Sequence, residues 1–175
     1  MENKDFIQKD NFDLIQNIHI VAYEPAFSII GDPEKKNAKT RQSADHSMVY
    51  IVSTMLRKAI EDEEFINKLK DLNSLNEIWK SLILLPEDYS QKAIKNANTI
   101  KLVNKTTFEH GGKEYDEKYP EGIPTSIKIS LTDGRVLDSK LVMFPAGHSK
   151  NVEADLNGIL ENKFRLFGKI ALGDC

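Results

Sequence analysis

Residues able to receive a small anion gather in one short stretch of the chain. Arg41, Asp45 and His46 supply a cation, a carboxylate and an imidazole just before a run with helical periodicity. We expect Ser43 to cap that helix and Asp45 to lie in its first turn, where free backbone N–H groups and the helix dipole favour negative charge. The stretch predicts a site for a small carboxylate. The alternative interpretation is that Asp45 and His46 only cap and orient a core helix.

A second polar corner lies just before the last predicted helix. There, His148 and Lys150 place an imidazole and an ammonium in a turn that contains Pro145 and Gly147. An imidazole so placed could bind a ligand or transfer a proton. Proline and glycine alone also explain the turn, and Asn151 could cap the helix. His148 is therefore a candidate site residue with a structural alternative.

The other ionisable residues form no known catalytic or metal-binding pattern. The sequence contains no P-loop, dinucleotide-binding glycine motif or nucleophile elbow. Its four histidines lack metal-ligand spacing, and the single cysteine, Cys175, can form no internal disulfide. The group 109–116 could be a metal or acid–base cluster, but Gly111 and Gly112 favour an exposed loop. We predict no metal and no cofactor.

Composition narrows the class of protein. The chain has 175 residues, 40% of them hydrophobic and 29% charged, which is typical of one soluble globular domain. A net charge of −3 without a basic stripe argues against a nucleic-acid partner. Lys150, Lys163, Arg165 and Lys169 are predicted to lie on solvated helix surface. No apolar run is long enough to cross a membrane, and the polar start predicts a cytoplasmic protein.

The elements that must position these residues can be predicted from periodicity. Alternation at Ile18, Ile20 and Ala22 predicts a strand. The central helix is expected over 48–60, with Ser53, Thr54, Arg57 and Lys58 mostly on its polar side. Its apolar positions are Met48, Ile51, Val52, Met55, Leu56, Ala59 and Ile60.

The second half of the chain shows both strand and helix signals. The pattern predicts a short strand at 106–109 and a hairpin at Asp133-Gly134, with a returning strand over 136–144. A capping box at 74–77 opens a helix that Pro86 closes. A final helix is expected from about Asn151, with these residues on its buried side: Val152, Leu156, Ile159, Leu160, Phe164 and Phe167.

This order of elements predicts the fold class. We expect a loose segment over residues 1–13, followed by one α+β domain over 14–175. The domain should have a small mixed or antiparallel sheet that includes a β-hairpin, with the helices packed on one face.

Several segments of the chain resemble the MmgE/PrpD family, the 2-methylcitrate dehydratases and their relatives. The resemblance runs in order from about Phe12 to Ala171. It rests on Asp32-Pro33, on 40–47 followed by Tyr50-Ile51-Val52, and on 109–125, 143–148 and 160–165. Family members dehydrate 2-methylcitrate, or act on related tricarboxylates, without a known metal requirement. They combine a large helical domain with a smaller α+β lid and are usually dimeric.

The resemblance covers only the lid and the start of the C-terminal helix. It implies a fragment or split-gene product of a 2-methylcitrate dehydratase-like hydro-lyase of propionate catabolism, inactive unless an N-terminal helical domain is supplied. Arg41, Asp45, His46 and His148 carry over as substrate-binding candidates, whereas the principal catalytic groups of the family lie outside the matched region. The alternative is a non-enzymatic or vestigial module that binds a partner or forms a homodimer.

Overall fold

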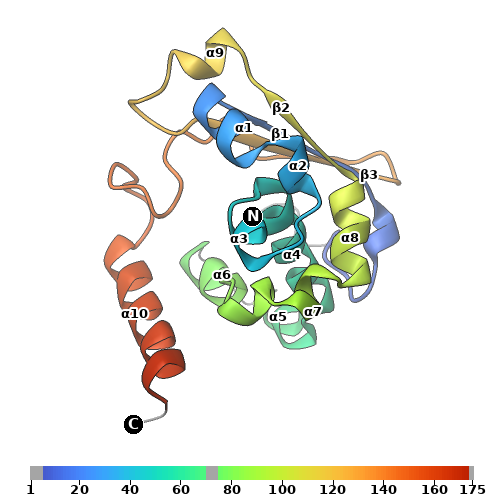
Figure 1. The fold of residues 1–175 in the computed structure, drawn as a ribbon, viewed down its shortest axis with the longest axis vertical. Helices are drawn as coiled ribbons and strands as arrows, with labels where there is room; N and C mark the ends of the chain where they lie inside the picture. The colour runs from blue at the N-terminus through green and yellow to red at the C-terminus, as the bar shows by residue number, and fades with distance from the viewer. Residues whose placement is uncertain (1–5, 70–74, 174–175) are drawn as a thin grey trace.

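A four-stranded mixed sheet forms the frame of the computed structural model, which describes residues 6–69 and 75–173 (Figure 1). The strand order is β2-β1-β3-β4. The central strand β1 (Ile15–Ala22) runs parallel to β2 (Thr106–His110) and antiparallel to β3 (Thr125–Leu131). The short strand β4 (Val136–Asp138) pairs antiparallel with β3. The predicted α+β class, mixed sheet and hairpin are confirmed.

The register of the strands makes one face of the sheet apolar. Ile18 lies between Thr106 and Ile129, and Ile20 lies between Phe108 and Ile127. Because side chains alternate along a strand, these residues share one face. That face carries the main core, in which the β1 isoleucines pack with residues of the helices beneath the sheet.

Helices fill the long crossover from β1 to β2 and lie largely on this apolar face (Figure 1). The α-helices of the crossover are α1 (Glu24–Ile30), α2 (Pro33–Lys36), α3 (Arg41–Asp45), α4 (Met48–Glu61), α5 (Glu63–Leu69), α6 (Leu75–Leu82), α7 (Gln91–Ile94) and α8 (Ala97–Asn104). Single 3-10 turns, η2 (Phe12–Leu14) and η3 (Pro86–Tyr89), precede β1 and α7, and α9 (Lys113–Asp116) follows β2. Ser74, the first residue of the predicted capping box, lies outside the described residues.

The N-terminal residues from 6 onward contact this domain, although the sequence predicts a loose segment over 1–13. Phe12 is buried in the main core, and Phe6 packs against the same cluster. The backbone N–H of Asp10 donates to the carbonyl of Ile60 at 3.2 Å. Residues 6–13 therefore extend the domain, and the first five residues lie outside the description.

The start of the central helix differs from the prediction. Thr40 and Ser43 form a capping box that opens a separate short helix, α3, and Ser47 rather than Ser43 caps α4. Asp45 consequently lies in the last turn of α3 and not in the first turn of α4. The chain breaks here because each of two nearby hydroxyls, on Thr40 and Ser47, accepts a backbone N–H at a helix start.

The predicted polar side of α4 is also wrong in part. Ser53 and Thr54 are fully buried, although the sequence pattern places them opposite the core. α4 packs below the sheet and also contacts α8, so more than one of its sides is covered. A helix enclosed in this way need not show a single apolar stripe.

The returning strand of the hairpin is shorter than expected. Instead of extending over 136–144, β4 ends at Asp138, and only an isolated bridge joins Thr125 to Val142. Lys140 adopts a left-handed backbone conformation with φ of 58°. This conformation interrupts the extended path that a strand requires.

The last helix, α10 (Leu156–Leu172), corrects two expectations. It begins at Leu156 because Asp155 accepts the backbone N–H of Gly158, whereas Asn151 accepts from Glu153 and Ala154 in the preceding turn. Of the six residues predicted to be buried, only Ile159 is buried; Leu156 is partly covered, and the other four are exposed. Figure 1 shows α10 standing at the side of the domain, with few neighbours to cover it.

Candidate functional site

Arg41 and Asp45 line one open pocket of about 370 Å³. The two side chains come from α3, and η3 contributes Tyr89 to the same lining. The helix α10 also lines the pocket and supplies Lys163 and Phe167. Segments from three distant parts of the chain thus meet around this pocket, which we call the α3/α10 pocket.

The charges of the α3/α10 pocket suit a carboxylate ligand. Arg41 and Lys163 are cations, and Asp45 is the one acid among the described residues that line it. The Arg41 guanidinium makes no ion pair with another described residue, so its planar fork of donors is available. Such a fork can bind a carboxylate through two parallel hydrogen bonds.

His46 forms a tight pair with Asp45 at the edge of α3. Its Nδ1 lies 2.5 Å from Asp45 Oδ1 and 3.0 Å from the Gln42 carbonyl oxygen. The hydrogen bond to Asp45, followed by the bond to Gln42, raises the pKa of the His46 imidazole above its ordinary value of 6.5. Because both acceptors engage Nδ1, Nε2 remains free to donate a proton outward.

We expect Asp45→Asn to lower the pKa of His46, because the substitution removes the negative charge that stabilises the imidazolium. The raised folded-state pKa means that the pair stabilises the fold fully below about pH 6.5 and that this stabilisation is lost as the pH rises through the raised value. A pH titration of the imidazole NMR signals measures the shift. An unchanged His46 titration would show that the pair does not form in solution, and His148 serves as the reference signal in the same spectra.

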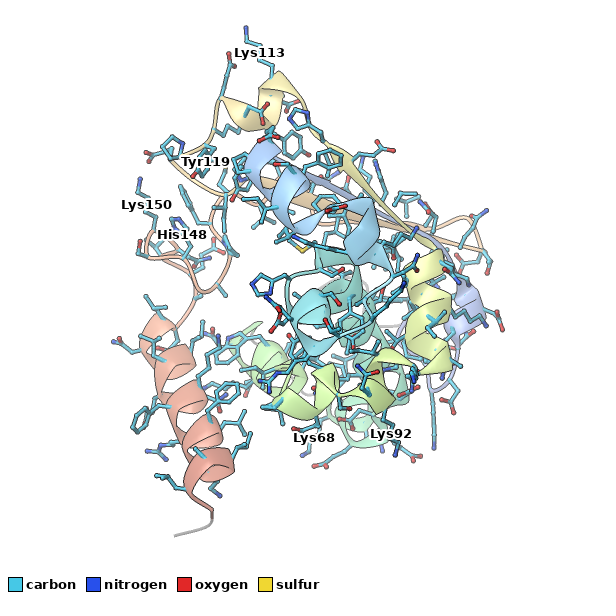
Figure 2. The ribbon with its side chains drawn as sticks, in the orientation of Figure 1. Lys68, Lys92, Lys113, Tyr119, His148 and Lys150 are labelled. Carbon is cyan, nitrogen blue, oxygen red and sulfur yellow. The ribbon has the colours of Figure 1, made fainter. Side chains whose placement is uncertain are left out.

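His148 lies apart from the α3/α10 pocket and is not among its lining residues. Figure 2 shows it beside Lys150 in the loop that precedes α10. Its Nδ1 accepts the backbone N–H of Lys150 at 3.1 Å, and its ring lies 5.1 Å from that of Phe144, centroid to centroid. Lys150 in turn pairs with Glu121 at 2.5 Å. These contacts give His148 a role in shaping the turn and do not bring it to Arg41.

The polar residues of 109–116 hold neighbouring elements together through hydrogen bonds. His110 Nε2 lies 2.9 Å from Asp116 Oδ2, and Asp116 Oδ1 accepts the Glu24 backbone N–H at 2.8 Å. The hydrogen bond from Glu24, followed by that from His110, lowers the pKa of Asp116. These hydrogen bonds of Asp116 link β2 and α9 to the start of α1. Within the described part of the chain, no three histidine, cysteine or acidic side chains gather as a metal site would require.

Lys163 and Tyr89 are pocket residues that the sequence alone did not identify. Lys163 is exposed on α10, as the sequence predicts, and it also lines the α3/α10 pocket together with Arg41. No local motif distinguishes it from its neighbours on α10. Only the position of α10, which contacts α6, reveals the second cation.

The fold and the pocket define an α+β protein with an open, net cationic pocket at the junction of α3, η3 and α10. Comparison of the chain with protein-family models and with curated proteins finds no match. None of the helices that the structure describes is both long enough and apolar enough to cross a membrane.

Proposed function

We propose that this chain is the lid portion of a tricarboxylate hydro-lyase similar to 2-methylcitrate dehydratase, inactive until a helical domain covers it. One observation carries the proposal: Arg41 and Lys163 line a single open pocket whose α10 wall has an uncovered apolar surface. The cations suit the carboxylates of the substrate, and the apolar surface suits the missing domain. The proposal includes the cytoplasmic location predicted from the sequence.

The helix α10 carries an uncovered apolar surface. Phe164 is 82% exposed, and four other apolar residues of the helix are also exposed: Leu160, Phe167, Ile170 and Leu172. Helices of globular proteins normally bury their apolar side, and contiguous exposed apolar patches mark interaction sites. We call these five residues the α10 apolar face. Its position beside the α3/α10 pocket means that a domain docked on it would also reach the pocket.

The chemistry explains why the lid would be inactive alone. Dehydration of a hydroxyl-bearing tricarboxylate needs a base for the carbon-bound proton, an acid for the leaving hydroxyl, and cations for the carboxylates. The α3/α10 pocket supplies Arg41 and Lys163 as cations, and the Nε2 of nearby His46 is a candidate acid. A base fixed within reach and a wall that excludes water would have to come from the second domain.

The first test is an assay of 2-methylcitrate and citrate dehydration, followed by the ultraviolet absorbance of the unsaturated product. The chain is assayed alone and after co-expression with a helical domain from the same genome. Turnover in the mixture alone is the expected result. Absence of turnover in both samples, with both polypeptides folded, would contradict the proposed enzymatic function.

In the active mixture, we expect Arg41→Ala to lower kcat/KM by roughly 10- to 100-fold, the loss that follows when a charge-assisted hydrogen bond of about 1.5–3 kcal/mol is removed. Arg165→Ala is the matched control, because Arg165 is exposed on α10, pairs with Glu161 on its own helix and is not among the described residues that line the α3/α10 pocket. Equal activity of the two variants would contradict a substrate contact at Arg41.

The α10 apolar face also favours a second candidate function, a non-enzymatic module that self-associates or binds a partner. Sedimentation equilibrium of the purified chain tests self-association. Two results together would support this alternative over the lyase. The chain would form a stable dimer that Phe164→Ser combined with Phe167→Ser dissociates, and it would show no turnover in the presence of the helical domain.

A further inference from the structure

A second pocket, separate from the α3/α10 pocket, carries only positive formal charge. It is an open pocket of about 290 Å³, and its lining includes Lys36, Lys39 and Lys95. Lys36 ends α2, Lys39 follows in the next loop, and Lys95 follows α7. None of the described residues that line it is acidic. Three cations around one small volume repel one another, so an anion placed among them would be stabilised. We call this cavity the lysine pocket.

The three ammonium groups are available to a ligand. Lys36 Nζ donates to the Thr106 carbonyl at 2.7 Å, which holds it in place and leaves two further N–H donors. The ammonium groups of Lys39 and Lys95 make no ion pair or hydrogen bond with any other residue that the structure describes. The Gln91 amide donates to the Lys39 carbonyl at 2.8 Å and so fixes the backbone that carries this lysine beside α7.

A buried hydroxyl at the lysine pocket lacks a partner. Thr99 lines the pocket and is 1% exposed, and its Oγ1 has no hydrogen-bond partner in the described structure. A threonine in a helix commonly bonds the carbonyl four residues earlier, and an unsatisfied buried hydroxyl is costly. Such groups are rare in folded proteins and call for an explanation. The Thr99 Oγ1 is itself covered, so a ligand oxygen would become its partner only with a small rearrangement of the pocket wall.

The remainder of the lining determines the kind of anion. Besides its lysines, the pocket has an apolar part of its lining, formed by Tyr50, Ile94 and Val103. Its volume of about 290 Å³ lies just below the usual range for small-molecule sites, which favours a small ligand. The described lining has no arginine fork and no glycine-rich backbone, the features that cradle phosphates. We propose that the lysine pocket binds a small organic carboxylate with a short aliphatic body, its head among the lysines and its chain against the apolar side.

The proposal is tested by titrating the full ¹⁵N-labelled chain with hexanoate and following backbone amide shifts by NMR. We expect saturable shifts at Thr99, at Lys95 and around Lys39. Inorganic phosphate tests for a general anion site, and hexanol tests for an apolar site without charge recognition. Binding of either compound as tightly as hexanoate would overturn the proposal, as would hexanoate shifts that are absent or lie elsewhere.

Variants separate the lysine pocket from nonspecific attraction. Lys39→Glu combined with Lys95→Glu is expected to raise the dissociation constant of hexanoate by at least about tenfold, since each removes a charge-assisted contact. Lys92→Glu is the control for one charge reversal and is compared with Lys39→Glu and Lys95→Glu taken singly, because Lys92 lies on α7 outside the pocket lining (Figure 2). Thr99→Val, which keeps the side-chain shape, should also weaken binding. Unchanged affinity in the double variant, with its fold intact by the same spectra, would overturn the proposal. The two pockets share no lining residue, so this result is independent of the lyase assay.

Discussion

Asp88→Ala is expected to lower the free energy of unfolding by about 3 kcal/mol, because it removes the acid at the centre of a largely buried ion-pair network. The Asp88 side chain is 9% exposed, and its Oδ2 accepts from Lys58 Nζ at 2.7 Å and from the Leu85 backbone N–H at 2.9 Å. Arg57 Nη2 lies 3.7 Å from Oδ1. Alanine would leave Lys58 without its acid at the junction of α4 and η3, whereas Arg57 keeps its ion pair with Glu61 at 2.6 Å.

Urea unfolding followed by circular dichroism measures this loss, and two further variants locate its origin. Asp88→Asn keeps an acceptor for the Leu85 N–H and should lose less stability than alanine. Glu63→Ala breaks the exposed Lys9–Glu63 pair, whose side chains are 52% and 65% exposed, and should cost far less stability than Asp88→Ala because solvent screens the pair. If Asp88→Ala cost no more than Glu63→Ala, the network would not stabilise the fold.

Ile18→Ala is expected to cost about 3 kcal/mol of unfolding free energy, within the range for large-to-small substitutions in a packed core. Ile18 is fully buried in the centre of β1, with Thr106 and Ile129 opposite it on the neighbouring strands. The alanine substitution would leave a cavity at this position. The strands on both sides of β1 and the helices below it limit how far the neighbouring residues can move to fill that cavity. The lost transfer energy and the cavity then add together.

A graded pair of controls makes the core prediction specific. Ile18→Val removes one methylene and should cost about 1 kcal/mol. Val136→Ala, on the edge strand β4, changes an exposed side chain and should stay within about 0.5 kcal/mol of the starting protein. Chemical denaturation of the three variants under one condition gives the series. Equal costs at positions 18 and 136 would contradict the proposed core.

Local patterns sufficed to predict where the strands lie and the fold class, but not where β4 ends. The alternation at Ile18, Ile20 and Ala22 placed β1 correctly, and Asp133-Gly134 placed the hairpin, because side-chain period and turn chemistry act over a few residues. The class followed from the order of these elements, since each must cover the apolar side of another. The break between α3 and α4 was missed because several hydroxyls near it can cap a helix and the pattern alone does not choose between them.

Long-range packing decided the surroundings of the candidate site. Arg41 and Asp45 were identified from sequence, but the contribution of Lys163 depends on where α10 packs, more than a hundred residues further along the chain. Periodicity could show that α10 is amphipathic, yet it could not show that Phe164 faces solvent, because burial requires a second surface. Likewise, Ser53 and Thr54 are buried only because α4 is covered on more than one side. Sequence patterns predicted which residues could do chemistry; the meeting of distant segments decided which of them share a pocket.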